Sequence, residues 1–371
     1  MPRAGWKKPV SERRLSDLVS VGVLTRVFPP ELVDEVIAAA GRTEQRNRTL
    51  PARVMAYFAI GMALYSEGSY EDVLAQLTDG LSWASAWTET FTPPSKSAIF
   101  QARARLGAQP LAVLFERVAK PIGGQVGGQQ TPGGWLAGRR MVAIDGMCLD
   151  VADTTVNAEH FGRPGVNKGE QAAFPQARVV ALAECGTHAV FAAEIGAYSQ
   201  SETALTEPLL GRLEPGMLLL ADRGFFSYAL WRKAIATGAD LLWRVRTDRG
   251  GPTPIHLEDL PDGSWLAHLQ QTHSAAARAA EPMLVRVIDY TIDDGRDNPT
   301  TYRLLTTVTD PEQVSAVELA ATYAERWEVE LTSTSSRPTS VDRAPCCAAS
   351  PPTWSCRRSG ATCAATTRSG P

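Results

Sequence analysis

The first third of the chain carries apolar residues at the spacing of amphipathic helices. This spacing is clear in ELVDEVIAAAG (31–41) and PARVMAYFAIGMALYSEG (51–68), each with a glycine near its end as a stop signal. SYEDVLAQLTDGLSW (69–83) and SKSAIFQARARLG (95–107) indicate two further helices, and serines can cap the second of them. We therefore expect residues 1–130 to form an all-helical domain.

The pattern changes to that of strands after a linker rich in glycine and glutamine, QVGGQQTPGGWLAGRR. RRMVAIDGMCLDV and ARVVALAE are strand-like, and a turn at Gly186 joins the second of them to a third strand as a hairpin. A helix, the buried strand MLLLADRGF, a second helix and the buried strand DLLWRVR follow. This order predicts an α/β fold with a ribonuclease-H-like core, whose first part spans residues 138–246.

The remainder of the chain divides into three parts. Residues 247–312 alternate apolar with polar residues and predict a β-rich insertion before the last core helix. That helix, SAVELAATYAERWEVEL, is assigned to residues 313–332. Residues 333–371 contain no Lys or Glu and have no apolar period, so we expect a disordered tail without a packed core.

Composition limits the classes of protein. The chain has 371 residues and a net charge of -3, which gives no overall case for nucleic acid but leaves room for a local basic face. No stretch approaches the roughly 20 apolar residues of a membrane span, and MPRAGWKKPVSERR has no signal-peptide core, so a cytoplasmic protein is expected. The late cysteines Cys346, Cys347, Cys356 and Cys363 lack C-x2-C spacing and a nearby histidine, so we expect no zinc site.

Basic residues indicate where DNA could bind. A short helix, a turn and a second helix carrying Arg103 and Arg105 fit a helix-turn-helix reader, with a helical bundle and a solvated face as the alternative. Arg163 and Lys168, in a loop of the core, are further candidates that are otherwise solvated. His160 has no metal-ligand spacing, and neither has His188, so both are expected to be structural.

Two aspartates each follow an apolar run directly. Asp145 lies in AIDG and Asp222 in LLLADRGF, at strand ends where ligands of α/β sheets bind. A single such carboxylate can cap the next loop, but two on neighbouring strands make a hard-cation site that suits Mg²⁺. Glu330 could supply a third ligand, whereas Asp150 and Asp153 are competing candidates near Asp145. Three carboxylates can hold two divalent ions roughly 3.5 to 4 Å apart for phosphodiester cleavage.

AIDG, LLLADRGFFSY and YAERWEVEL together resemble the DDE transposases of bacterial insertion sequences, specifically the insertion sequence 4 family. Tyr323, Arg326 and Glu330 match the first three positions of the family signature Y-x2-R-x3-E-x6-K. The loop DTTVNAEHFGRPG and the helical N-terminal region are also similar, so the resemblance runs from about Leu15 to Thr332.

The resemblance implies a metal-dependent enzyme that binds double-stranded DNA at terminal inverted repeats, cuts it and joins the 3′ ends to a target. Asp145, Asp222 and Glu330 would hold Mg²⁺ or Mn²⁺, and Tyr323 and Arg326 would face the DNA backbone. A surface network of ion pairs is the alternative for that helix. The resemblance also allows a homodimer in a synaptic complex and a location at the nucleoid.

The family pattern breaks after Glu330. Position 337 carries Arg337 where the family has lysine, and Pro338 next to it disfavours helix. With permitted codons, residues 333–340 read FDELKTHQ in the neighbouring frame, which continues the helix and restores the lysine. We interpret the tail as out of frame and expect impaired activity. A non-catalytic repressor that occupies the terminal repeats and a metal-dependent nuclease are the alternative functions.

Overall fold

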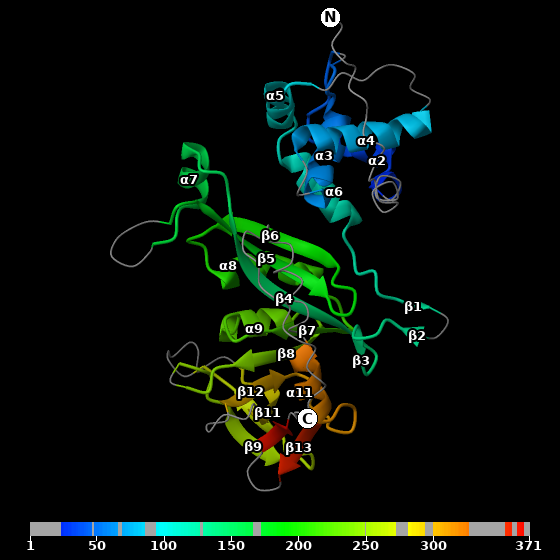
Figure 1. Cartoon of the computed structure of the whole chain (residues 1–371). Helices are drawn as coiled ribbons and strands as arrows, with labels where there is room; N and C mark the ends of the chain where they lie inside the picture. The colour runs from blue at the N-terminus through cyan, green and yellow to red at the C-terminus, as the bar shows by residue number, and fades with distance from the viewer. Residues whose placement is uncertain are drawn as a thin grey trace, which may run out of the picture. The chain divides into compact units, whose positions relative to one another are not determined.

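The computed structural model describes residues 24–46, 48–65, 69–85, 94–126, 129–165, 172–248, 250–271, 281–293, 300–325, 353–357 and 362–366. The chain forms two compact units, Met1–Ala119 and Lys120–Pro371 (Figure 1). No helix of the described part combines the length and apolar character needed to cross a membrane.

The described part of the first unit is helical. Its helices are α2 (Pro30–Ala39), α3 (Ala52–Leu64), α4 (Tyr70–Ser85), α5 (Lys96–Leu106) and α6 (Gln109–Val118). The first four coincide with the helices that the apolar spacing predicts, and Ser95 caps α5 by accepting a hydrogen bond from the Ala98 N–H. The core is built around Met55, Phe58 and Ile99, all almost completely buried.

The second unit is organised around one large sheet. Its strands are β3 (Trp135–Leu136), β4 (Arg139–Asp150), β5 (Gln176–Glu184), β6 (Val190–Ala197), β7 (Met217–Ala221), β8 (Asp240–Val245), β9 (Ile255–Asp259), β10 (Trp265–Leu269), β11 (Met283–Asp293), β12 (Thr300–Thr306), β13 (Thr353–Arg357) and β14 (Thr362–Thr366). A separate two-stranded hairpin precedes them, formed by β1 (Gln125–Val126) and β2 (Gln129–Gln130).

The first five long strands lie in the spatial order β6-β5-β4-β7-β8. β4, β5 and β6 are antiparallel neighbours, and the turn before β6 contains Gly186 at φ 80°. β7 is parallel to β4, and β8 is parallel to β7. Helix α8 (Glu202–Leu209), extended by the 3-10 turn η1 (Leu210–Arg212), leads to β7, and α9 (Tyr228–Ile235) leads to β8. The structure is therefore of the α/β class with a mixed sheet.

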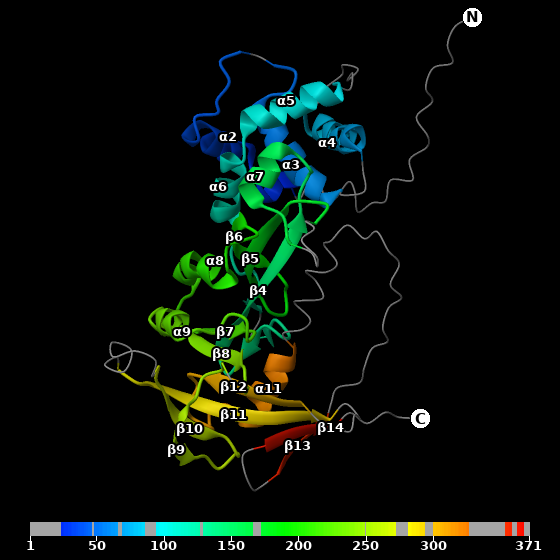
Figure 2. The same cartoon turned by 90° about the vertical axis from the view of Figure 1, so that its left-hand side faces the viewer.

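Helices cover both faces of this sheet. α8 and α9 pack on the face that carries Val142, Leu219 and Trp243, and the helix α11 (Ala316–Glu325) packs on the opposite face. Figure 2 shows α8 and α9 on the left of the strands and α11 on the right. The central strands are buried on both faces, which explains their nearly continuous apolar runs. A short helix, α7 (Thr155–Phe161), follows β4.

The β-rich region extends the same sheet. β12 pairs with β8, β11 pairs with β12, and β10 and β9 continue from β11. β14 also pairs with β11, and β13 pairs with β14, so two strands lie where composition predicts a disordered tail. Pairing at an open strand edge uses backbone groups and does not require an apolar period. The disordered tail over residues 333–371 stays a prediction.

Candidate active site at the strand ends

The parallel register of β4 and β7 brings the two predicted aspartates together. Ala143 pairs with Leu220, and two residues further along the two strands are Asp145 and Asp222. Side chains two residues apart in a strand share a face. Ala143 and Leu220 belong to the core beneath α11, so both aspartates are placed on the α11 side of the sheet.

Tyr323 of α11 reaches this site from above the sheet. Its hydroxyl lies 3.3 Å from Asp222 Oδ1 and 3.4 Å from the carbonyl oxygen of Ala221. The residue is only 2% exposed, because α11 buries Leu319, Ala320 and Tyr323 against the sheet. The hydroxyl of Tyr323 therefore faces the carboxylate of Asp222, and the predicted contact of Tyr323 with the DNA backbone stays a prediction.

The N-terminus of α11 is held by a capping box. The Ser315 side chain accepts a hydrogen bond from the Glu318 N–H, and Glu318 accepts hydrogen bonds from the backbone and hydroxyl of Ser315. These bonds lower the pKa of Glu318 below its ordinary value. The helix that carries Tyr323 therefore begins at a well-defined position.

A buried ion pair fixes the same helix to the β-rich region. Arg286 of β11 is 0% exposed and pairs with Asp262, which also accepts a hydrogen bond from the Ala316 N–H at 2.7 Å. Arg286 donates further to the hydroxyl of Ser264 and to the carbonyl of Val314, both at 2.8 Å. Burial alone would raise the pKa of Asp262, but the hydrogen bonds from Ser264 and Ala316 and the charge of Arg286 bring it below its ordinary value.

Arg244 lies beside Asp222 and is not among the predicted site residues. Ala221 pairs with Trp243 in the parallel register, so Asp222 and Arg244 are the next positions of the two strands. Arg244 Nη1 lies 3.7 Å from Asp222 Oδ1, and its guanidinium lies 4.4 Å from the ring centre of Tyr302. An arginine inside an otherwise apolar strand was the signal that could have identified it.

The competing acidic candidates have local partners. Asp150 accepts a hydrogen bond from Gln176 Nε2 at 2.8 Å, and Asp153 pairs with Arg163. Arg163 also donates to the carbonyl of Ala172 at 3.2 Å, so its guanidinium holds its own loop together. Neither aspartate needs a cation to explain its position.

Other predicted site residues lie elsewhere. Glu330, Arg326 and Lys168 fall outside the described residues. Arg103 is exposed on α5 and donates to the hydroxyl of Tyr70 at 2.9 Å, whereas Arg105 turns towards Glu44. The turn before α5 falls at residues 86–93, outside the described part, so the helix-turn-helix stays a prediction. His160 packs edge-on against Phe161, and His188 lies in the turn after β5 at φ 58°.

The chemistry of the pair Asp145 and Asp222 fits a divalent cation. Carboxylate oxygens are the donors that hard cations prefer, and the Asp222 side chain is 34% exposed, so an ion could reach it. Within the described ranges no three acidic, histidine or cysteine residues form a group that could hold a metal. The described part therefore brings two carboxylates to this position, and Glu330, the predicted third ligand, lies outside it.

Comparison with known families decides what kind of protein carries this site. The family described as "Insertion element 4 transposase N-terminal" matches residues 18–116. The family described as "Transposase DDE domain" matches residues 136–335. The second match covers more than half of the chain. The chain belongs to the DDE transposase family of the insertion element 4 type.

Individual relatives of this DDE transposase chain agree with the family. It is 29% identical over 302 residues to "Transposase InsG for insertion sequence element IS4" of Escherichia coli K12, covering 81% of this chain and 65% of InsG. "Putative transposase InsZ" of the same organism is 24% identical over 233 residues, which are 63% of this chain and 74% of InsZ. Among solved structures, the chain is similar to a cryo-EM structure of a piggyBac transposase synaptic complex with hairpin DNA, at 11% identity and a TM-score of 0.36. The matched region covers 87% of this chain and 68% of the piggyBac chain.

Proposed function

We propose that the chain is an insertion-sequence transposase, which cuts phosphodiester bonds at the ends of a DNA element and joins the 3′ ends to target DNA. The observation that carries this proposal is the pair formed by Asp145, within β4, and Asp222, directly after the end of the parallel strand β7, on the face that α11 covers. The strand order β6-β5-β4-β7-β8 supports a ribonuclease-H-like core. Membership of the DDE family supports the reaction class.

We assign Asp145, Asp222 and Glu330 as the ligands of Mg²⁺ or Mn²⁺. Glu330 follows Tyr323 by seven residues, which is about two turns if α11 continues, so it would lie on the helix face that meets the sheet. When bound, divalent ions supply Lewis-acid activation of water or a 3′-hydroxyl and stabilise the leaving oxygen. Tyr323 and Arg244 would hold the Asp222 carboxylate in one orientation.

The substrate in this proposal is double-stranded DNA, at terminal inverted repeats and at a target. Arg326 and Lys168 would contact phosphates near the site, because a cationic side chain offers donors to phosphate oxygens. Arg103, exposed on α5 beside Lys96 and Gln101, would belong to the DNA-reading face of the helical unit. A homodimer in a synaptic complex and a location at the nucleoid complete the proposal.

We further propose that the tail is read out of frame and impairs the enzyme. The family match ends at residue 335, close to Ser333 where the composition changes. The nucleotide sequence across codon 333 tests this interpretation. If codons 333–340 cannot encode a helix with lysine at position 337 in the neighbouring frame, the frameshift is excluded.

The same break favours one alternative, a non-catalytic protein that binds the terminal repeats and represses transposition. A strand-cleavage assay with terminal-repeat DNA and Mg²⁺ separates the functions, with Asp222→Ala as the comparison. Metal-dependent cutting that Asp222→Ala abolishes, together with strand transfer, supports the transposase. Binding without cutting supports the repressor, and cutting without strand transfer supports a nuclease.

A further inference from the structure

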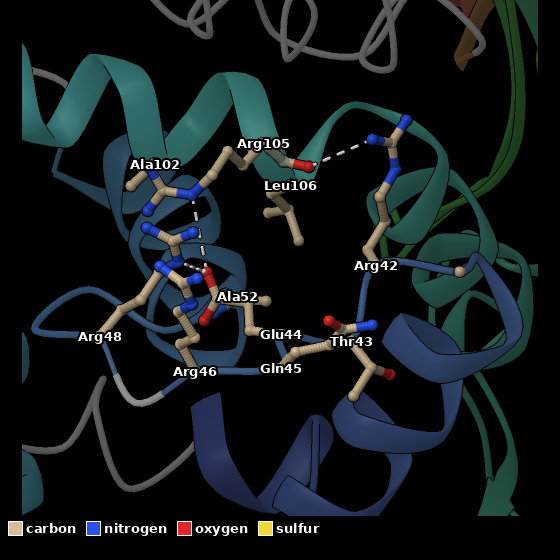
Figure 3. Close-up of a pocket in the computed structure, with 11 residues that line it drawn as sticks. Arg42, Thr43, Glu44, Gln45, Arg46, Arg48, Ala52, Ala102, Arg105 and Leu106 are labelled. Atoms are coloured by element: carbon tan, nitrogen blue, oxygen red, sulfur yellow. Dashed lines mark hydrogen bonds and ion pairs between the residues drawn. The ribbon is translucent and has the colours of Figure 1, made fainter.

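The helical unit contains a pocket lined by arginines, distinct from the strand-end site. Its volume is about 320 Å³, and it lies between the loop after α2 and the C-terminal end of α5 (Figure 3). The charged side chains that line it are Arg42, Arg46, Arg48, Arg105 and Glu44. Four guanidinium groups therefore share a small cavity with one carboxylate.

The direction of the loop after α2 is set by the way this helix ends. Gly41 adopts φ 66°, its N–H donates to the carbonyl of Ala38, and the N–H of Arg42 donates to the carbonyl of Ile37, both at 2.9 Å. This is a Schellman motif, which requires the left-handed conformation that glycine adopts without strain. The reversal aims Arg42 at α5, where Arg42 Nη1 donates to the carbonyl of Arg105 at 3.3 Å.

Glu44 organises the opposite side of the pocket. Its Oε2 accepts a hydrogen bond from the Ala52 N–H at 3.2 Å, in the first turn of α3. Its Oε1 lies 3.4 Å from Arg48 Nε and 3.6 Å from Arg105 Nε. Figure 3 shows the guanidinium groups of Arg46, Arg48 and Arg105 gathered around this carboxylate, with Arg42 on the other side. One acidic group thus holds several cations at one place.

The charges and donors of this cluster are left incompletely matched. Arg46 is exposed, and no hydrogen bond or ion pair joins it to any residue in the described ranges. The Nε atom of Arg105 is buried and forms an ion pair with Glu44 Oε1 at 3.6 Å, which is beyond hydrogen-bond distance. Neighbouring cations repel one another, and a buried donor without an acceptor is unfavourable, so a bound anion would relieve both conditions.

The lining indicates which anion fits. Guanidinium groups present planar pairs of donors that match phosphate oxygens. No aromatic side chain is among the lining residues, so the pocket has no platform on which a nucleobase could stack. Its volume is at the lower end for small-molecule sites. These features favour a phosphate group without recognition of a base.

We propose that this arginine pocket binds a backbone phosphate of duplex DNA and thereby anchors the helical unit on DNA independently of sequence. The proposal rests on the proposed function, since it names a second place where the same substrate is held. The ligand chemistry is that of a phosphodiester, and Arg46 is the side chain whose charge is most available to it.

The test measures binding of the full chain to a fluorescently labelled duplex of arbitrary sequence by anisotropy, over a series of salt concentrations. Arg46→Ala is compared with Arg26→Ala, an exposed arginine of the same unit that does not line the pocket. We expect Arg46→Ala to weaken binding about three- to ten-fold and to reduce the salt slope by about one, and Arg26→Ala to match the wild type. Arg46→Lys should retain part of the affinity.

A second measurement identifies the source of the phosphate. Thermal shift of the wild type and of Arg46→Ala is recorded with pyrophosphate and with ATP. The proposal is overturned if Arg46→Ala and Arg26→Ala bind the duplex equally well. It is also overturned if ATP stabilises only the wild type while duplex affinity is unchanged by Arg46→Ala, because the pocket then serves a small anion. Absence of duplex binding by the wild type contradicts the proposed function itself.

Discussion

Replacing Asp262 with alanine should destabilise the second unit strongly. The substitution leaves Arg286, which is 0% exposed, without its carboxylate partner and removes the acceptor of the Ala316 N–H. Removing one member of a buried ion pair costs about 3–5 kcal/mol. At roughly 2–4 °C per kcal/mol for a domain of this size, Tm should fall by about 6–20 °C.

Thermal unfolding followed by circular dichroism measures this effect in the full chain. Asp248→Ala is the matched control, because Asp248 pairs with Arg246 at an exposed position, and its Tm should equal that of the wild type. The double variant Asp262→Ala/Arg286→Met should recover much of the lost stability, since it removes the unpaired charge as well. Equal Tm values for Asp262→Ala and Asp248→Ala would show that the buried pair of Asp262 and Arg286 does not stabilise the second unit.

Three further predictions follow from the same structure. The pKa of Asp262 is lowered in the folded state, so the ionised carboxylate stabilises the fold above about pH 4. This stabilisation is lost as the pH falls through the folded-state pKa. Below pH 4, the Tm of the wild type should therefore drop more steeply than the Tm of Asp262→Ala. Tyr323→Phe removes the hydroxyl 3.3 Å from Asp222 and keeps the buried ring. We expect the rate of Mn²⁺-dependent DNA cleavage to fall by about three- to ten-fold with little change in Tm. An unchanged cleavage rate would argue against a role of the Tyr323 hydroxyl in orienting Asp222. Gly186→Ala places a Cβ 2.4 Å from the carbonyl oxygen of Pro132, at a residue whose φ is 80°. Calorimetry should therefore show that the free energy of unfolding falls by more than about 1 kcal/mol. Gly211→Ala is the control and should not show this loss, because its Cβ meets nothing within 4 Å.

The sequence predicts the central strands and the position of Asp222, because buried parallel strands leave long apolar runs. The run MLLLA is β7, and Asp222 follows directly after its end. The prediction that Asp145 lies at a strand end is wrong, because the pairing with β5 continues β4 as far as Asp150. The β4–β7 register still aligns the position of Asp145 with that of Asp222. The sequence also predicts the turn at Gly186, because glycine is favoured where a turn between two strands needs a residue in the left-handed conformation.

The environment of the site could not be predicted in the same way. Arg244 meets Asp222 only because β8 lies next to β7 in parallel register, and strand order is not contained in a local pattern. Tyr323 carries the family signature, but its burial depends on which face of α11 meets the sheet. The arginine pocket joins α5 to a loop more than 50 residues earlier, through contacts of Glu44 and Arg42 that no local spacing reveals.

Binding of Mn²⁺ to the full chain shows whether Asp145 and Asp222 together hold a divalent cation, as we propose. Electron paramagnetic resonance of free Mn²⁺ gives the dissociation constant for the wild type, Asp145→Asn, Asp222→Asn and the control Asp150→Asn. Asp150 is the control because it lies on the same strand as Asp145 but accepts a hydrogen bond from Gln176. We expect Mn²⁺ to bind at least about ten-fold more weakly to Asp145→Asn and Asp222→Asn, and to bind Asp150→Asn as it binds the wild type. Unchanged affinity in Asp222→Asn, or an equal loss in Asp150→Asn, would show that the two aspartates do not share a cation.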